Sequence, residues 1–537
     1  METPTSIPSG IQSPEETDME FKFEETRPPS LYPVQSRMEH PQSLPREIAF
    51  VGVLCMAQLM TQAALAQSIA PLHIIGDSFN ITSPGQLSWF PAAYSLTVGT
   101  FILIAGRLGD LYGHKRFFIA GFLWFGFWSL MAGFTIYVQR GGGKGAIFFD
   151  ICRALQGIGP AFLLPNAIAI LGRTYAPSRR QEMVFSLFGA TAPTGYALGA
   201  IFSSLFAQRV WWPWAFWVMG VICFLLAIAG YFAIPHTPSP YIFSGKDGIT
   251  AWARVDGWGS ITGITALVLI NFAWNQGPVV GWKTPYTYIL LIVGFLFLSL
   301  FGFIESRATF PLIPRDALST ETAFVLGCVA AGWSSFGTWV YYLWQFCEEL
   351  KHAPPLLTSA YFVPTTVSGF FAALTTGMIL HRVPASFVML IAMLAFMTGT
   401  ILVATAPVSQ IYWAQIFVAM VVMPWGMDMS FPAATILLSN RMKREEQGVA
   451  ASLVNTIINY SISIGLGMAG TIEGRVGGTG QEGLLRGYRG ALYFGVGISG
   501  LGVLTALAFG TSHFLRARGD EAEDADGRSR ERSSLEA

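Results

Sequence analysis

Charged residues are scarce in this chain of 537 residues, of which only 12% are Asp, Glu, Lys or Arg. A soluble protein typically carries about twice that share, so the composition argues against the several soluble domains that the length alone would allow. The 32 basic and 32 acidic residues give a formal net charge of zero. A balanced chain has no general attraction to nucleic acid, and we expect no nucleic-acid partner.

Cysteine is also rare, and the motifs of several enzyme classes are missing. The five cysteines show no metal-ligand spacing, so we expect buried thiols and no metal site. No G-x-x-x-x-G-K-[ST] stretch occurs, so ATP is not the energy source within this chain. H-E-x-x-H and G-x-S-x-G are absent as well. These absences predict a protein that is not an enzyme and needs no cofactor.

The two ends lack the apolar runs of the middle. Residues 1–46 are rich in Pro, Ser and Glu and have no basic start followed by an apolar segment and a cleavage site. We therefore expect a disordered tail rather than a cleaved signal peptide. The segment 516–537 is highly charged and predicts a second disordered tail.

Apolar sequence dominates the rest, with 52% hydrophobic and 14% aromatic residues and a mean hydropathy of +0.49. Runs of ~20 apolar residues recur, which is enough to cross a bilayer as helices. Helices are the expected form because backbone groups in lipid must be hydrogen-bonded internally. The sequence therefore predicts an all-α integral membrane protein. Its fourteen expected spans are 48–75, 86–106, 117–138, 146–172, 181–207, 214–234, 257–276, 285–305, 321–347, 356–380, 384–405, 410–437, 447–471 and 490–514.

The distribution of basic residues predicts the orientation in the membrane. An even number of spans puts both tails on one side. Lys and Arg are about twice as frequent in the loops on that side as in the opposite loops. Because cytoplasmic loops carry the excess of Lys and Arg, both termini are expected in the cytoplasm.

The stretch GRLGDLYGHKR, Gly106–Arg116, places five ionisable side chains between two apolar spans. Its glycines, among them Gly106 and Gly113, permit a tight turn and close helix approach. Asp110 is able to meet a helix N-terminus or an arginine. Lys115 and Arg116 would hold the loop at the cytoplasmic face. A plain basic stop between two helices is the simpler alternative.

Two motifs carry a resemblance to a known family. GRLGDLYGHKR resembles the signature loop between helices two and three of the major facilitator superfamily. RALQGIG, Arg153–Gly159, resembles the R-x-x-Q-G-x-G motif of its proton-coupled drug antiporters. Fourteen spans point to the fourteen-spanner drug:H⁺ antiporter branch. GATAPTGYALGAIFSSL and MPWGMDMSFPAATILLSN are similar to fungal members of that branch, which include aminotriazole and borate resistance pumps and low-affinity ammonium transporters.

The resemblance implies a fold and a way of working. Two six-helix bundles, 47–235 and 321–515, would rock about a central site, and the segment 236–320 would be a linker with two extra membrane helices. The charged loop would be a latch that holds the bundles together on the cytoplasmic side, with Asp110 near the start of the helix at about Gln447. The latch residues would be Gly106, Asp110, Gly113, Lys115 and Arg116.

Two charged residues inside spans are the candidates for proton coupling. Arg153 lies well inside the fourth span, where a charge costs several kcal/mol and must face a cavity or a partner. An interfacial arginine that reaches outward is the alternative. Asp428, in PWGMDMSFP, is interpreted as the one acidic residue deep in a span, in a helix that Pro424 and Pro432 would bend. A structural ion pair is the alternative for Asp428.

Several polar residues share helix faces in the spans and are candidates for a substrate cavity, although helix packing explains each of them alone. They are Gln58, Gln62, Gln156, Tyr341, Gln345, Asn455 and Asn459. Pro193, Gly195 and Gly199 would bend the fifth span and allow close packing. Asn80 begins an N-glycosylation pattern in an outer loop.

These features predict a secondary active transporter that couples protons to the export of small organic compounds such as drugs, toxins or secondary metabolites. A permease for ammonium or borate is the alternative, because the branch's acidic residue near Ala66 is missing and the G-P-x-x-G-G signature is incomplete. A transporter-like nutrient sensor is a third possibility. The expected partners are a small-molecule substrate, protons and the lipid bilayer. We expect a monomer in the plasma membrane, with the vacuolar membrane as the alternative.

Overall fold

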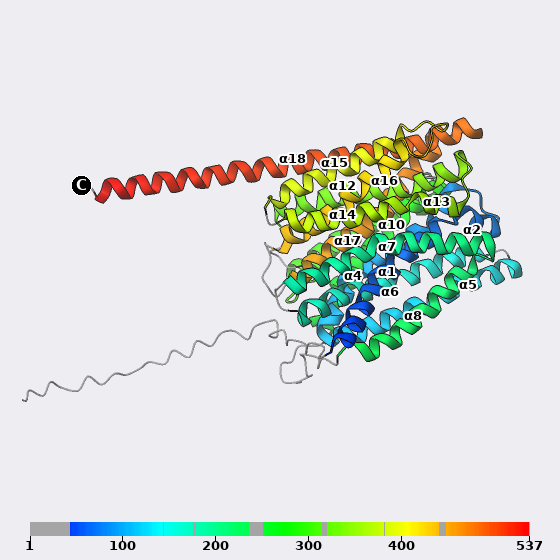
Figure 1. Cartoon of the computed structure of the whole chain (residues 1–537), viewed down its shortest axis with the longest axis horizontal. Coiled ribbons are helices and arrows are strands. Elements are labelled where there is room, and N and C mark those ends of the chain that lie inside the picture. The colour runs from blue at the N-terminus through cyan, green and yellow to red at the C-terminus, as the bar shows by residue number, and fades with distance from the viewer. Residues whose placement is uncertain are drawn as a thin grey trace, which may run out of the picture.

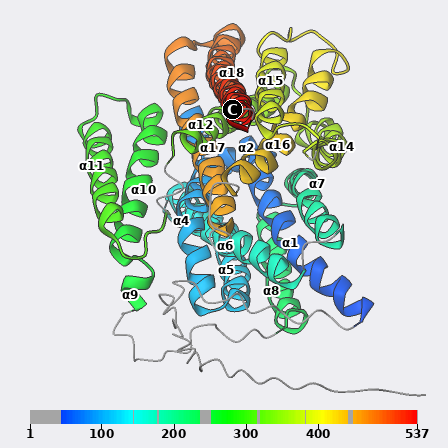
Figure 2. The ribbon, with the colours of Figure 1, turned by 90° about the vertical axis from the view of Figure 1, so that its left-hand side faces the viewer.

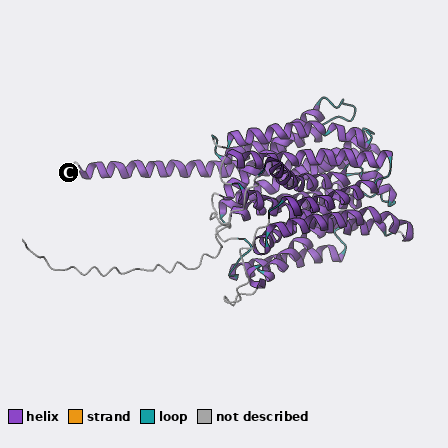
Figure 3. Ribbon diagram, turned by 60° about the horizontal axis from the view of Figure 1, so that its bottom comes forward, coloured by secondary structure: helices purple, strands orange, loops and turns teal. Residues whose placement is uncertain are grey.

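The computed structural model describes residues 43–142, 144–175, 179–235, 251–313, 319–380, 382–439 and 447–535, and helices dominate this part of the chain (Figure 3). Fourteen of the described helices are long and apolar enough to cross a membrane, which confirms the predicted number of spans. No strand occurs in the described ranges. Most of residues 1–46 lies outside them.

Six long helices from the first half of the chain pack on one another as an N-terminal bundle (Figure 1). They are α1 (Leu44–Ile69), α4 (Trp89–Tyr112), α5 (His114–Gly142), α6 (Gly145–Thr174), α7 (Arg179–Arg209) and α8 (Pro213–Ala233). Two short helices, α2 (Leu72–Ser78) and α3 (Pro84–Leu87), connect α1 to α4. Both lie at the end of the bundle opposite the start of α1.

A second group of six helices forms a C-terminal bundle. It contains α12 (Thr320–Gln345), α14 (Val363–Ile379), α15 (Ala385–Ala404), α16 (Gln415–Ser439), α17 (Gln447–Val476) and α18 (Gly480–Leu535). A π-helical turn, η2 (Phe346–Leu350), extends α12, and α13 (Pro355–Tyr361) leads into α14. The helix α18 continues past the last candidate span, Gly480–Thr511, through most of the segment that was expected to be a disordered tail.

The helix α16 was expected to bend or break at its prolines. It runs unbroken as one helix through Pro424 and Pro432, so the expected break is absent. A proline inside a helix removes one backbone hydrogen bond, and in a bundle neighbouring helices tolerate that loss. The helix therefore carries Asp428 without a backbone break.

The two extra spans, α10 (Gly257–Val280) and α11 (Pro285–Arg307), form a hairpin that stands at the side of the bundles (Figure 2). A short helix, α9 (Ala251–Arg254), precedes it. The side chain of Asp256 accepts from the Gly259 amide and caps the first turn of α10. Gly281 ends α10 with a φ of 87°, a left-handed conformation that glycine adopts easily.

The helices α4 and α17 join the two bundles along a seam, and α10 packs against both. The Ser463 hydroxyl donates to the Ala92 carbonyl oxygen at 3.0 Å and lies 2.7 Å from Asn271 Oδ1. Asn275 Nδ2 donates to Asn271 Oδ1 at 2.7 Å. Asn271 and Asn275 therefore fasten the hairpin to this seam.

Candidate functional site

Arg153 is fully buried in the N-terminal bundle and donates to four oxygen atoms. Its Nε donates to the Phe90 carbonyl at 3.1 Å, and its Nη2 donates to the Ala64 carbonyl at 2.8 Å and the Ser68 hydroxyl at 3.1 Å. Its Nη1 donates to Gln156 Oε1. The planar fork of arginine is suited to several fixed acceptors at once. The side chain is therefore held inside the bundle and does not reach outward to the interface.

The surroundings of Arg153 are aromatic and mostly neutral. Its guanidinium lies 4.6 Å from the centre of the Tyr94 ring, a cation–π distance. No carboxylate of the described residues lies within ion-pair distance of it. Asp150, one turn earlier on α6, is the nearest acidic residue on that helix, and its Oδ1 is buried without a hydrogen-bond partner. The charge of Arg153 is thus balanced mainly by hydrogen bonds.

Asp428 lines a small cavity of about 60 Å³ between the two bundles. Its Oδ2 is buried and has no hydrogen-bond partner among the described residues. Gln62 of α1 reaches the same cavity. The remaining lining side chains include no Lys, Arg or His; they are Ala192, Pro193, Tyr196, Trp333, Phe336, Trp339, Val340, Phe362, Thr365, Thr366 and Met427.

The two bundles come into direct contact beside Asp428. The Thr366 hydroxyl of α14 donates to the Pro193 carbonyl oxygen of α7 at 3.1 Å. Gly369, one turn further along α14, leaves space for both neighbours: a Cβ atom there would lie 2.8 Å from Asp428 Oδ2 and 3.3 Å from Pro193 Cβ. Pro193 therefore lines the cavity and contacts the opposite bundle.

The two glycines that follow Pro193 pack α7 directly on α1. A Cβ atom on Gly195 would lie 2.2 Å from the Leu59 carbonyl oxygen, and one on Gly199 would lie 2.4 Å from the Ala63 carbonyl oxygen. Such distances are too short for any side chain. The positions permit the backbones to approach, as small residues do in membrane helix pairs.

Asp110 and Lys115 of the charged loop make their contacts inside the N-terminal bundle, whereas Arg107 Nε donates to the Arg254 carbonyl oxygen of α9 at 3.2 Å. Asp110 Oδ1 accepts from Arg173 Nη2 at 3.0 Å and lies 3.3 Å from His114 Nε2. Lys115 Nζ donates to the Tyr231 carbonyl oxygen at 2.7 Å, which ties α5 to the end of α8. Arg116 is exposed. Residues 440–446, which precede the expected neighbour of Asp110 at Gln447, lie outside the described residues.

Two glycines of the loop have separate geometric roles. A Cβ atom on Gly106 would lie 3.4 Å from the Ser452 hydroxyl, so this position sits where α4 meets α17 across the seam. Gly113 ends α4 with a φ of 103°, a left-handed conformation that favours glycine. The sharp turn between α4 and α5 depends on it.

The other cavity candidates lie apart from the cavity. Gln156 belongs to the Arg153 network and donates to the Ser129 hydroxyl at 2.6 Å. Asn455 and Asn459 donate to carbonyl oxygens of their own helix. Gln345 contacts His73 of α2 through its Oε1. Gln58 and Tyr341 are not among the residues that line the cavity.

Asp428 lies near the middle of the twelfth span, Gln415–Leu438, whereas two buried carboxylates lie within a few residues of span ends. Glu473 lies within the thirteenth span, only 8% exposed, and accepts from the Tyr342 hydroxyl at 2.8 Å. Glu305 lies within the eighth span and is 6% exposed. Glu305 is the last residue of the predicted span 285–305, whereas Glu473 lies just beyond the predicted span 447–471 and falls within the longer observed helix. Asp428 alone of the three lines the cavity between the bundles.

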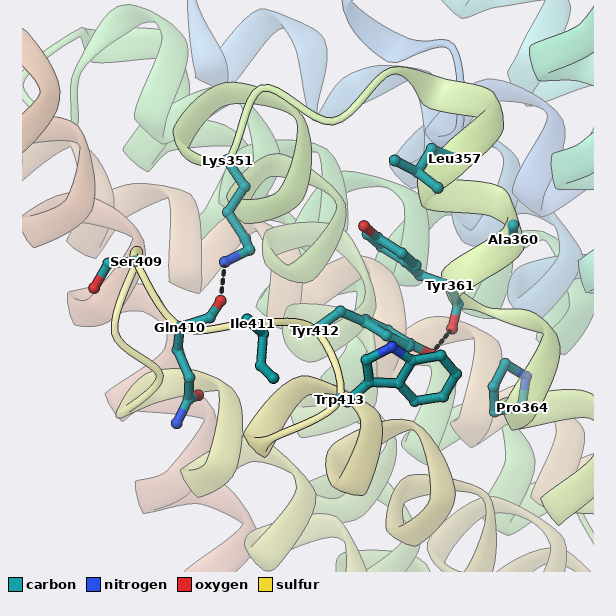
Figure 4. A pocket seen from close by; sticks show the side chains of 10 residues that line it. All are labelled: Lys351, Leu357, Ala360, Tyr361, Pro364, Ser409, Gln410, Ile411, Tyr412 and Trp413. Atoms are coloured by element: carbon teal, nitrogen blue, oxygen red, sulfur yellow. Dashed lines mark hydrogen bonds between the residues drawn. The ribbon is translucent and has the colours of Figure 1, made fainter.

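A larger pocket of about 650 Å³ opens within the C-terminal bundle at the end opposite the chain termini (Figure 4). Tyr361 and Tyr412 stack there with their ring centres 4.1 Å apart. Burial raises the pKa of Tyr412 to about 12 and lowers the pKa of Lys351. Lys351 Nζ donates to the Val408 and Gln410 carbonyl oxygens at 2.7 and 2.5 Å. Because the Lys351 ammonium is engaged by backbone carbonyls, the pocket offers mainly aliphatic and aromatic surface.

Three further predictions concern glycosylation at Asn80, metal binding and the cysteines. Asn80 is exposed between α2 and α3 and has a φ of 58°. The described residues contain no group of three or more His, Cys, Asp or Glu side chains that could hold a metal ion. All five cysteines are buried and unpaired.

The major facilitator superfamily model matches residues 52–466 of this chain. The chain belongs to the major facilitator superfamily. This transporter is 63% identical over 480 residues to the low affinity ammonium transporter of Saccharomyces cerevisiae, covering 89% of this chain and 92% of that one. It is 51% identical over 481 residues to the efflux pump terJ of Aspergillus terreus, covering 89% and 91%.

Solved structures agree on the fold of this transporter. A crystal structure of the peptide transporter POT in complex with sulfate matches with a TM-score of 0.61 and 15% identity, covering 89% of this chain and 96% of that one. At that identity the similarity speaks for the fold alone. The comparisons thus identify an integral membrane protein of a transporter family whose members include efflux pumps and an ammonium transporter.

Sequence reasoning missed the aromatic residues around Asp428. Trp333, Phe336 and Trp339 come from α12, whereas Tyr196 comes from α7 and Phe362 precedes α14. Aromatic residues are frequent throughout this chain, so their number gave no signal. The spacing of Trp333, Phe336 and Trp339, three residues apart, marks one face of a helix and was the available clue.

Proposed function

We propose that this transporter uses the proton gradient to export small, positively charged organic compounds, and that they bind at the cavity beside Asp428. One observation carries the proposal: a carboxylate oxygen without a partner among the described residues faces a cavity lined by aromatic rings and by no basic side chain. Aromatic faces attract cations, and a carboxylate accepts hydrogen bonds from protonated amines. The efflux relatives support export.

A permease for ammonium is the second candidate. The cavity of about 60 Å³ holds a few water molecules or one small ion. The relative named as a low affinity ammonium transporter is 63% identical to this chain. Ammonium and organic amines share the same charge and the same N–H donors, so the two candidates differ in the size of the solute.

In this proposal Asp428 and Arg153 take part in proton coupling. Asp428 takes up a proton or the substrate, so that the two compete for one carboxylate. Arg153 keeps the N-terminal bundle polar at its centre through four hydrogen bonds. Asp110, Arg173 and the loop around them act as the latch at the cytoplasmic end, with both termini in the cytoplasm of a plasma-membrane monomer.

The test replaces Asp428 with Asn in protein reconstituted into liposomes. Without a titratable group, Asp428→Asn is expected to lose solute movement driven by an imposed pH gradient, down to the level of empty liposomes. Exchange of solute for solute is expected to survive with weaker solute binding, because the Asn amide oxygen still accepts hydrogen bonds from a protonated amine but carries no charge. The neighbouring substitution Met429→Leu conserves volume at a buried residue that does not line the cavity and is the matched control. Gradient-driven transport at the wild-type rate in Asp428→Asn would remove this residue from the mechanism.

The same liposomes separate the two candidates by solute size. Labelled methylammonium serves as the small probe and labelled tetraphenylphosphonium as the large organic cation. Transport of both probes supports export of organic cations. Transport of methylammonium alone, unaffected by the large cation, supports the ammonium permease.

A further inference from the structure

Among the described residues, three hydrogen bonds between side chains join the two bundles at the end where α2 and α13 lie. Trp344 Nε1 donates to the Tyr196 hydroxyl at 3.0 Å. The Ser204 and Ser359 hydroxyls lie 2.9 Å apart. The third contact joins His73 Nε2 to Gln345 Oε1. Alternating access requires these contacts to break whenever this end opens.

The third contact differs from the other two because it contains a histidine and lies next to a carboxylate. His73 belongs to α2, and its Nε2 lies 3.4 Å from Glu349 Oε1. The side chains of His73 and Glu349 are 26% and 40% exposed, so water and protons reach them. Gln345 is only 2% exposed, and its Nε2 has no hydrogen-bond partner among the described residues.

We propose that His73 is a second proton-binding residue of the transport cycle, and that its protonation closes this end of the transporter. Two acceptor oxygens face Nε2, so Nε2 carries a hydrogen in both states. The incoming proton then binds Nδ1, and no other bond changes. The neutral hydrogen bond to Gln345 becomes charge-assisted and therefore stronger. The positive ring also attracts the Glu349 carboxylate.

Few other charged groups lie near the His73 side chain. Asp77 lies one turn along α2 and is exposed. Glu348 is next to Glu349 on η2, and Tyr488 of α18 is within electrostatic range of both carboxylates. Lys351 donates its ammonium hydrogens to two backbone carbonyls. Apart from Lys351, the groups named around His73 are therefore acidic or neutral.

The consequence for transport rests on the proposed orientation, in which this end faces the outside. External acid would then protonate His73 and hold the outer end closed. The proton-loaded transporter would open toward the cytoplasm. Histidine is suited to this step because its charge changes between pH 5 and pH 8.

The experiment measures the distance between the bundles by pulsed electron resonance on purified protein, which needs no substrate. Spin labels are attached at Thr82→Cys and Glu482→Cys, which are exposed on opposite bundles at this end. The native cysteines are buried and do not compete. On lowering the pH from 8 to 5.5, the ratio of closed to open protein is expected to rise about fivefold to tenfold.

Three variants make the test specific. His73→Gln keeps a neutral hydrogen-bonding side chain and is expected to remove the pH response, whereas His73→Lys is expected to stay closed at both pH values. His352→Gln is the matched control, because His352 lies at the same end but pairs with Gln481 inside the C-terminal bundle. A full pH response in His73→Gln would overturn the proposal. Because this experiment measures conformation and not transport, its result is independent of the result of the Asp428 transport assay.

Discussion

At the scale of single residues, Arg153 shows how a charge is kept inside an apolar bundle. Its four acceptors are two backbone carbonyls, a hydroxyl and an amide oxygen, drawn from α1, α4 and its own helix. Three helices are therefore linked through one side chain. A network of this kind is costly when incomplete, because each buried acceptor that loses its donor is left unpaired.

We expect Arg153→Lys to lose gradient-driven transport and to lower the thermal unfolding midpoint. A single ammonium cannot replace a fork that serves four acceptors, and each unpaired buried acceptor costs roughly 1–3 kcal/mol. Transport in liposomes and thermal unfolding in detergent measure the two effects. Arg140→Lys, at an exposed position of α5, is the control. Wild-type transport and stability in Arg153→Lys would show that the fork has no special role.

At the scale of helices, the pair α1 and α7 depends on glycine at two places. Gly195 and Gly199 face carbonyl oxygens of α1, whereas a Cβ atom added to Gly189, earlier on α7, would have no atom within 4 Å. The same helix thus offers both a tight and an open glycine. Substitution by alanine separates the effect of close packing from that of helix propensity.

Gly195→Ala is expected to destabilise the protein by about 1–3 kcal/mol, because the new methyl group would overlap the Leu59 carbonyl and force the helices apart. It should also reduce transport, since Pro193 and the cavity lie one turn away. Gly189→Ala is expected to be neutral or slightly stabilising, since alanine favours helix more than glycine does. Thermal unfolding of both variants compares their stabilities. Equal unfolding midpoints would contradict close packing at Gly195.

At the scale of the whole molecule, the orientation in the membrane is open to a direct test. Gly141 and Gly172 lie near opposite ends of the bundle, are exposed, and have no atom within 4 Å of an added Cβ. A membrane-impermeant thiol reagent is expected to label Gly141→Cys in intact cells. It should label Gly172→Cys only after permeabilisation. The reverse pattern would invert the orientation and with it the assignment of the outer gate.

The sequence alone was sufficient for the fold of the whole molecule, because a membrane span is specified by a local property, about 20 consecutive apolar residues. Span number, helical class and family could be predicted for that reason. The exact ends of the helices could not, and Glu473 was misplaced as a result.

The same distinction between local sequence and tertiary packing applies to the candidate sites. Arg153 and Asp428 stand out in the sequence because a charge within an apolar run is rare. Which polar residues meet depends on how helices distant in the chain pack, and no local pattern records it. Only the tertiary structure placed Ser68 with Arg153, Gln62 with Asp428, and Gln345 with His73 of the other bundle. Residues of similar polarity and spacing thus acquired different neighbours because contact between helices is decided by packing in three dimensions.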